Sequence, residues 1–266
     1  MSEELENLIA TRFIQRRDVK AVQFSNGAWS PDYKIERGDA HLPLGWDRNH
    51  LTAHLAGQRT YGHYVLDADD KCRVITFDID LIDEEFGGTY CIPDDDHVTE
   101  KINPRVIWQD REFVNGRNWL KYQMKMLATR FCGAFIEMGL DTAAAYSGSK
   151  GIHVYGFVDP MSARDAHEGA LLALDLIDEF EPYKGKHMFI HRNPDPWQGY
   201  RNFTVEIYPK QESLQGKTLG NLLRLPLGRN LKSDDPTFFL DLKTPMAVFQ
   251  PHKDPETLLR EGNPFS

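Results

Sequence analysis

The chain has 266 residues, of which 41% are hydrophobic and 27% charged, so it can bury one large core or two small ones. It contains no run of about 18 apolar residues, so no membrane span is expected, and its acidic residues 1–6 are unlike a signal peptide. The formal net charge of −9 argues against tight nonspecific nucleic-acid binding, although basic residues gather over 12–20 and 210–232.

The first half of the chain predicts short elements that lead to one clear strand. In chain order we expect a helix over 2–16, a strand over 19–24, a turn over 26–27, a short helix over 50–56 and a strand over 73–81. The first helix has Leu5, Ile9 and Phe13 on one face. The strand over 73–81 is nearly continuous in β-branched and aromatic residues. Residues 82–115 are acidic and rich in turn formers, which indicates an irregular surface excursion.

The second half alternates helices with strands. We expect a helix over 117–138, strands on both sides of the segment 147–153, a helix over 163–180, a loop over 181–201, strands over 203–208 and 221–227, and a proline-interrupted C-terminal segment that wraps the surface. Ser162 is a suitable N-cap for the helix over 163–180. The alternation predicts an α/β or α+β fold. No persuasive linker divides the chain, so residues 1–266 are expected to form a single domain.

Two carboxylates stand two residues apart in the strand over 73–81. Side chains at this spacing point to the same face of a sheet, so Asp78 and Asp80 repel each other and are costly to bury without compensation. Divalent cations with oxygen ligands are a common remedy. An exposed strand end with solvated aspartates is the alternative interpretation.

A third carboxylate, Glu206, lies in the strand over 203–208 with apolar neighbours on both sides. It could simply face solvent on a half-exposed strand. If it meets Asp78 and Asp80 in space, the three complete a cluster that can hold two Mg²⁺ or Mn²⁺ ions about 4 Å apart, as in in-line phosphoryl chemistry.

The segment SGSKGIH, residues 147–153, concentrates hydrogen-bond donors in a tight turn. Its two glycines let the backbone approach a ligand, and Ser147, Ser149, Lys150 and His153 add side-chain donors, which suits a triphosphate. It is not a Walker loop, because that pattern is absent and a strand follows. A polar hairpin whose turn only fixes the register, with His153 structural, is the alternative.

Two further cations, Lys210 and Arg224, stand near these motifs. Lys210 follows Glu206 by four positions, and Arg224 is alone among leucines, where an arginine usually has a specific acidic or phosphate partner. A surface ion pair is the alternative.

Taken in chain order, these motifs resemble those of the archaeo-eukaryotic primase superfamily. The similarity lies in Asp78-x-Asp80 on a strand, then SGSKGIH between strands, then Glu206 on a strand. The segment 147–155 looks like the polymerase domains of bacterial end-joining ligases. The segments 205–211 and 220–226 look like phage and mobile-element primase-polymerases, including the primase domain of TOTE conflict systems. The resemblance covers about residues 50–230.

The resemblance implies a fold and a set of residue roles. The fold would be a primase catalytic core with an RRM-like sheet packed against a second α/β unit, and the nucleotide would lie between them. Asp78, Asp80 and Glu206 would bind two Mg²⁺ or Mn²⁺ ions. The residues that would hold the triphosphate are Ser147, Ser149, Lys150 and His153, with Lys210 and Arg224 as further phosphate or template contacts.

The implied function is template-directed nucleotidyl transfer by a DNA primase or DNA polymerase, which adds nucleotides to a 3′-hydroxyl and releases pyrophosphate. One alternative is a metal-dependent nuclease on the same carboxylates, which would not need the SGSKGIH turn. The other is a non-catalytic RRM-like nucleic-acid-binding module, which would need exposed aromatic residues in place of the carboxylates.

Cofactors and partners follow from the same resemblance. Many primases carry a zinc-binding element, but Cys72, Cys91 and Cys132 are widely spaced and form no Cys-x-x-Cys pair, so no zinc is expected. The expected partners are single-stranded or primer–template DNA and NTP or dNTP. A helicase or other replication partner is expected on another chain, unless this chain is a fragment of a longer protein. No membrane partner is expected, and a reducing cytoplasm fits the cysteine content.

Overall fold

The computed structural model of the chain describes residues 2–35, 41–43, 45–82, 89–91, 99–101, 103–192, 202–246 and 248–266. Its helices are α1 (Glu3–Phe13), α2 (Arg48–Leu55), α3 (Pro104–Gln109), α4 (Val114–Glu137), α5 (Ala163–Ile177) and α6 (Pro255–Glu261). No helix among these residues is both long and apolar enough to cross a membrane.

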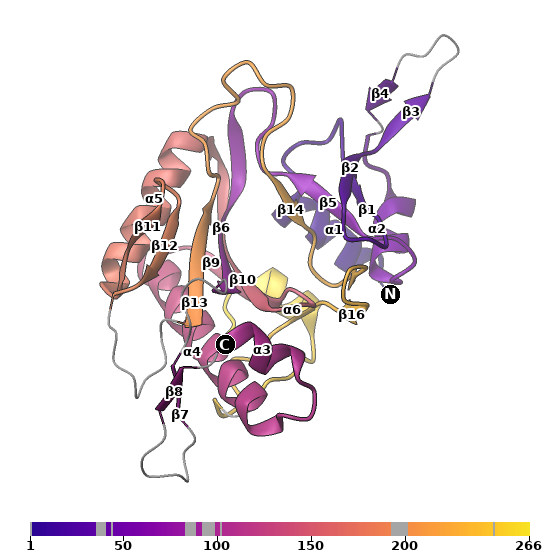
Figure 1. Ribbon diagram of the computed structural model, residues 1–266. Coiled ribbons are helices and arrows are strands. Elements are labelled where there is room, and N and C mark those ends of the chain that lie inside the picture. Colours follow the sequence, from indigo (N-terminus) through magenta and orange to yellow (C-terminus); the bar gives the residue numbers. More distant parts are fainter. Residues whose placement is uncertain are drawn as a thin grey trace.

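A seven-stranded antiparallel sheet forms the centre of the molecule (Figure 1). Its strands, in spatial order, are β11 (Phe180–Lys184), β12 (Met188–His191), β13 (Phe203–Tyr208), β6 (Lys71–Leu81), β10 (Gly151–Ser162), β9 (Asp141–Tyr146) and β17 (Phe238–Phe239). The long strands β6 and β10 pair in the middle. This order brings together segments that lie more than 100 residues apart in the sequence.

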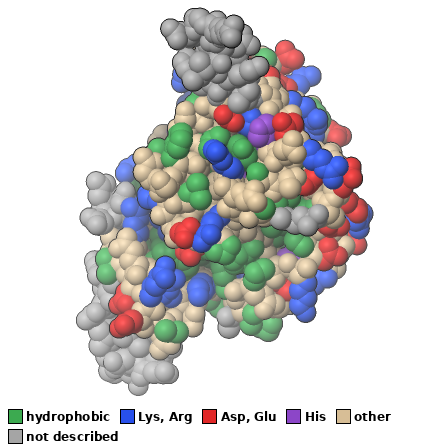
Figure 2. Space-filling view, turned by 90° about the vertical axis from the view of Figure 1, so that its right-hand side faces the viewer, with side chains coloured by type: hydrophobic (Ala, Val, Ile, Leu, Met, Phe, Trp, Pro, Cys, Tyr) green, Lys and Arg blue, Asp and Glu red, His purple; other side chains and the backbone are tan. Residues whose placement is uncertain are grey.

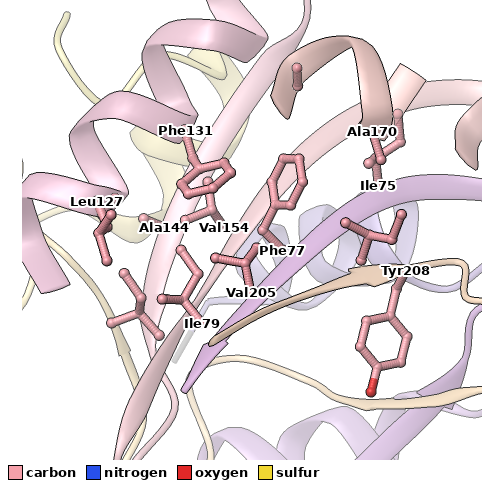
Figure 3. Packing of buried hydrophobic residues seen from close by; sticks show 14 of the residues in the cluster. Ile75, Phe77, Ile79, Leu127, Phe131, Ala144, Val154, Ala170, Val205 and Tyr208 are labelled. Carbon is pink, nitrogen blue, oxygen red and sulfur yellow. The ribbon is translucent and has the colours of Figure 1, made fainter. Parts of the chain in front are cut away.

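The two faces of β6 have different roles. Ile75, Phe77 and Ile79 point to one face and are buried against α4 and α5, where Phe77 lies 4.4 Å from Phe131 between ring centroids (Figure 3). Because side chains alternate along a strand, the even-numbered residues point to the other face. There Val74 is buried in a second cluster with α1. The aspartates of β6 lie further along this second face.

A smaller sheet stands on the second face, on the side of the molecule away from α4 and α5 (Figure 1). Its strands, in spatial order, are β14 (Leu222–Arg224), β5 (Tyr61–Tyr64), β1 (Ala21–Gln23) and β2 (Trp29–Pro31). The described residues also form three two-stranded ribbons: β3 (Tyr33–Ile35) with β4 (His41–Pro43), β7 (Thr89–Cys91) with β8 (Thr99–Lys101), and β15 (Arg229–Asn230) with β16 (Asp235–Pro236). The predicted α+β class, with two units packed together, is confirmed.

Most predicted elements are present, and the exceptions have identifiable causes. The Ser162 hydroxyl accepts a hydrogen bond from the Asp165 backbone N–H and caps α5 as predicted. The predicted loop over 181–201 is wrong in its first part, where β11 and β12 form a hairpin; residues 193–201 lie outside the described residues. Pro182 is tolerated in β11 because that strand is the edge of the sheet.

The excursion over 82–115 and the C-terminal segment also contain structure that the sequence did not predict. The excursion holds β7, β8 and α3, and α4 already begins at Val114. Residues 83–88, 92–98 and 102 lie outside the described residues. The C-terminal segment includes α6, which packs against α1. The expectation of one domain over 1–266 stays a prediction.

Candidate functional site

One row of side chains crosses the second face of the seven-stranded sheet. Strand pairing aligns Lys184, Met188, Glu206, Asp78, His153, Ala145 and Phe239. Directly paired residues of neighbouring antiparallel strands point to the same face. Strand register therefore makes Asp78 the neighbour of Glu206 on one side and of His153 on the other.

Asp80 extends this row by one step along β6. It points to the same face as Asp78 and pairs with Thr204 on β13 and with Gly151 on β10. The three predicted carboxylates line one common pocket, whose lining is Asp78, Asp80, Leu81, Arg105, Lys150, Tyr183, Lys184, Met188, Thr204 and Glu206. The structure thus brings together residues that lie up to 128 positions apart in the sequence.

Lysines accompany the two outer carboxylates of the cluster. The Lys150 ammonium lies 2.7 Å from Asp80 Oδ2, and the Lys210 ammonium lies 2.6 Å from Glu206 Oε1. The Tyr208 hydroxyl donates a 3.2 Å hydrogen bond to Glu206 Oε2. These contacts partly neutralise the charge that the cluster concentrates at the pocket.

Asp78, at the centre, carries the largest electrostatic cost. Burial raises its pKa well above the ordinary value, and the charges of Asp80 and Glu206 raise it further, against the opposing effect of Lys150 and Lys210. Its nearest cationic or imidazole partner in the row is His153, with Nε2 3.5 Å from Asp78 Oδ1. The ionised form of Asp78 is therefore destabilised in the protein alone.

The three carboxylates have the oxygen chemistry that hard divalent cations prefer, but their side chains do not converge on one point in this structure. Three carboxylates on adjacent strands supply the oxygen ligands that Mg²⁺ and Mn²⁺ prefer, and a cation would relieve the repulsion at Asp78. Among the described residues, however, no three Asp, Glu, His or Cys side chains converge as a metal site requires. The oxygens of Asp80 and Glu206 instead face Lys150 and Lys210.

The turn over 147–150 joins β9 to β10 beside the carboxylates. Its backbone closes through a 3.0 Å hydrogen bond from the Ser147 N–H to the Gly151 carbonyl. Gly148 has a φ of +73°, which favours glycine. A Cβ at Gly151 would overlap both the Ile79 carbonyl oxygen and Asp80 Oδ1, so only glycine lets β10 approach Asp80 this closely.

Side chains from other segments hold the carbonyl groups of this turn. The Tyr146 hydroxyl donates to the Ser149 carbonyl at 2.7 Å, and the Ser233 hydroxyl donates to the Gly148 carbonyl. The Ser147 carbonyl accepts from the Arg224 guanidinium and from the Asn230 amide at 3.4 Å. The turn is thus fixed by side chains from β9, from β14 of the smaller sheet and from the β15–β16 ribbon, with Lys150 directed at Asp80.

His153 is buried and held in a neutral form. Burial, followed by the nearby charge of Arg224, lowers its pKa to about 4. Its Nδ1 lies 3.0 Å from the Tyr155 hydroxyl, and its Nε2 faces Asp78. A neutral ring that accepts the Tyr155 proton at Nδ1 carries its own proton at Nε2, on the side of the pocket.

Arg224 connects the two sheets. It lies on β14, and its guanidinium stands 5.7 Å from the Trp29 ring centroid while it contacts the turn. Burial lowers its pKa, and the charge of Asp78 opposes this effect. Its Nε is buried and has no hydrogen-bond partner among the described residues.

Of the nine predicted site residues, Asp78, Asp80, Lys150 and Glu206 line this pocket. His153 and Lys210 contact its carboxylates, and Ser147, Ser149 and Arg224 lie at the adjoining turn. Sequence reasoning missed part of the pocket wall. Arg105 comes from α3, inside the segment that was predicted to be irregular. Tyr183 and Lys184 come from the hairpin that was predicted to be a loop. The only signal for the hairpin was the cluster Lys-Gly-Lys-His after Tyr183, and Arg105 had none.

Comparison with known proteins identifies a family whose sequence pattern this chain matches. Residues 7–262 match the family described as the TOTE conflict system, Archaeo-Eukaryotic Primase domain. No curated protein matches the sequence. Among solved structures, the polymerase domain of Mycobacterium tuberculosis Ligase D in complex with DNA is similar with 15% sequence identity and a TM-score of 0.38, over 98% of this chain and 88% of that chain. The family match spans both sheets and every residue of the pocket.

Proposed function

Because this chain belongs to the archaeo-eukaryotic primase domain family of TOTE conflict systems, we propose that it is a template-directed nucleotidyltransferase. It adds nucleotides to a 3′-hydroxyl and releases pyrophosphate, as a primase, a DNA polymerase or both. The observation that carries the proposal is the pairing of Glu206 with Asp78 beside Asp80, next to the turn that presents Lys150. Carboxylates and a phosphate-binding turn at one pocket are what this reaction needs.

Asp78, Asp80 and Glu206 would hold two divalent ions, Mg²⁺ or Mn²⁺. When bound, these ions activate the attacking hydroxyl and neutralise charge on the leaving pyrophosphate. Lys150, whose ammonium lies at Asp80, would contact phosphate oxygens of the incoming nucleotide when the carboxylates hold cations. Lys210, at Glu206, would be a further phosphate or template contact.

The donors around the turn would hold the triphosphate. Ser147, Ser149 and Lys150 belong to the turn itself, and His153 presents Nε2 toward the same pocket. Arg224 would contribute its Nε, which has no hydrogen-bond partner among the described residues. Because Tyr146, Ser233 and Arg224 already fix the turn, little conformational entropy is lost when the nucleotide binds.

The partners in this proposal are a nucleic-acid template with or without a primer, and NTP or dNTP. A helicase or other replication partner on another chain is a further part of it. We also propose a reducing cytoplasmic setting, which suits the buried free thiols of Cys72 and Cys132.

A labelled primer–template incubated with Mg²⁺ or Mn²⁺ and separate NTP and dNTP pools tests the proposal. Extension of the primer that depends on the template sequence is the expected result. Shortening of the primer would identify a nuclease instead. Binding that is unaffected by a chelator, without any change in primer length, would identify a non-catalytic nucleic-acid-binding module.

A further inference from the structure

The β11–β12 hairpin ends in a basic turn at the edge of the carboxylate pocket. Residues 183–187 read Tyr-Lys-Gly-Lys-His and contain no acidic residue. Lys184 and Lys186 are exposed, whereas Tyr183 is half-buried. The local charge is opposite to that of the chain as a whole, which is −9. A surface of this kind suits an anionic partner.

Strand register places the hairpin on the same row as the carboxylates. Lys184 pairs with Met188, which pairs with Glu206, so Lys184 stands two strands from Glu206. At the usual strand spacing this corresponds to about 10 Å. His187 bridges part of the interval, with Nε2 3.7 Å from Glu206 Oε1.

A bulge in β11 directs one more side chain into the pocket. Pro182 pairs with Phe189 and Lys184 pairs with Met188, so Tyr183 is the extra residue between them. Bulges of this type redirect side chains next to functional sites. Tyr183 and Lys184 both line the carboxylate pocket, and the Lys184 ammonium lies 5.0 Å from the Tyr183 ring centroid.

The in-line geometry of the proposed reaction indicates which substrate binds at this hairpin. The attacking and leaving oxygens of phosphoryl transfer stand roughly in line on opposite sides of the phosphorus atom. The triphosphate donors Lys150 and His153 lie on the β10 side of the carboxylates. The attacking 3′-hydroxyl therefore enters from the opposite side, that of β13, β12 and β11.

We propose that the turn of the β11–β12 hairpin binds the 3′ end of the primer strand, an inference that rests on the proposed nucleotidyl transfer. Lys184 and Lys186 contact backbone phosphates near the primer terminus. Tyr183 packs against the terminal nucleotide and positions its 3′-hydroxyl at Glu206 and Asp78. Aromatic and cationic side chains in combination are typical of surfaces that bind single strands and strand ends.

The double variant Lys184→Ala/Lys186→Ala tests this assignment. Its matched control is Lys217→Ala/Lys253→Ala, which removes two exposed lysines that do not line the pocket. Fluorescence anisotropy without nucleotide compares binding of primer–template with binding of the single-stranded template. Steady-state extension assays give the KM values for primer–template and for the nucleotide.

In the hairpin variant we expect the primer–template Kd to rise about tenfold and the slope of log K against log salt to fall by about two, because two phosphate contacts are lost. The nucleotide KM and the affinity for single-stranded template stay unchanged. An unchanged primer–template Kd, an equal loss in the control variant, or a raised nucleotide KM would each overturn the assignment. These outcomes leave the proposed function standing, whereas wild-type protein that extends no primer would overturn both.

Discussion

At the scale of single residues, Asp78 is a carboxylate whose ionised form the pocket disfavours. Burial and the neighbouring Asp80 and Glu206 raise its pKa, which means that the fold disfavours its ionised form. At neutral pH, in the absence of a divalent ion, the folded state therefore bears a free-energy cost that the unfolded chain does not.

Asp78→Asn should remove this cost together with the function. We expect the Tm of the variant in EDTA to exceed that of wild-type protein by a few degrees, at roughly 2–4 °C per kcal/mol. Mn²⁺ should raise the Tm of the wild type but not of the variant, and primer extension should be lost. Thermal unfolding with and without Mn²⁺ measures this, with Asp175→Asn on the exposed side of α5 as control. A lower Tm for Asp78→Asn in EDTA would contradict the account.

His63 is a buried histidine of a different kind. It lies on β5 with its ring centroid 6.2 Å from that of Phe13, and neither of its ring nitrogens has a hydrogen-bond partner among the described residues. Burial lowers its pKa from 6.5 to about 3. The folded protein thus keeps His63 neutral, while the unfolded chain takes up a proton below pH 6.5.

Stability should therefore fall as the pH drops from about 6.5 toward about 3. Between pH 7 and 5, His63 alone should remove about 2 kcal/mol from the free energy of unfolding. His63→Phe should flatten this dependence by the same amount, because Phe does not titrate. Urea unfolding at several pH values measures it, and an unchanged pH dependence in the variant would show that His63 is not held neutral.

At the scale of elements, the close approach of β10 to Asp80, directly after the turn over 147–150, depends on Gly151. Gly151→Ala should push Asp80 and β10 apart, because the added methyl group would overlap the Ile79 carbonyl and the Asp80 carboxylate. We expect a stability loss of about 1–3 kcal/mol and a large loss of extension activity. Gly133→Ala in α4 is the matched control, since nothing lies within 4 Å of its added methyl group. That control should be neutral or stabilised by up to about 1 kcal/mol.

Denaturant unfolding and extension assays on both glycine variants check this prediction. Activity in Gly151→Ala equal to that of Gly133→Ala would mean that the close approach of β10 to Asp80 is not needed.

Elements with a strong periodic pattern could be predicted, whereas those defined by tertiary pairing could not. The strand that holds Asp78 and the helix capped by Ser162 follow from local residue patterns. The β11–β12 hairpin was missed because Pro182 and Gly185 are loop signals, and only its position at the sheet edge makes Pro182 acceptable.

At the scale of the whole molecule, basic residues of the N-terminal segment form ion pairs within the protein. Arg12 pairs with Asp141 at 2.8 Å, and the fully buried Lys20 pairs with Asp32 at 3.1 Å. On the face drawn in Figure 2, Lys and Arg side chains alternate with Asp and Glu and do not form one continuous basic field.

The meeting of the three carboxylates could be predicted only in part. The order of motifs along the chain predicts that Asp78, Asp80 and Glu206 belong to one site. The strand order that pairs Glu206 with Asp78, and the contact of Arg224 with the Ser147 carbonyl across 77 residues, depend on how the two sheets pack. No local pattern encodes such packing, and the same holds for Arg105 on α3.

Titration with Mn²⁺ in the presence of a non-hydrolysable nucleotide, followed by the electron paramagnetic resonance signal of the free ion, tests most directly whether these carboxylates act together. Wild-type protein should bind two ions per chain. Glu206→Gln should lose at least one of them, although Glu206 is separated in sequence from Asp78 and Asp80. Equal Mn²⁺ binding by wild-type protein and Glu206→Gln would contradict the account.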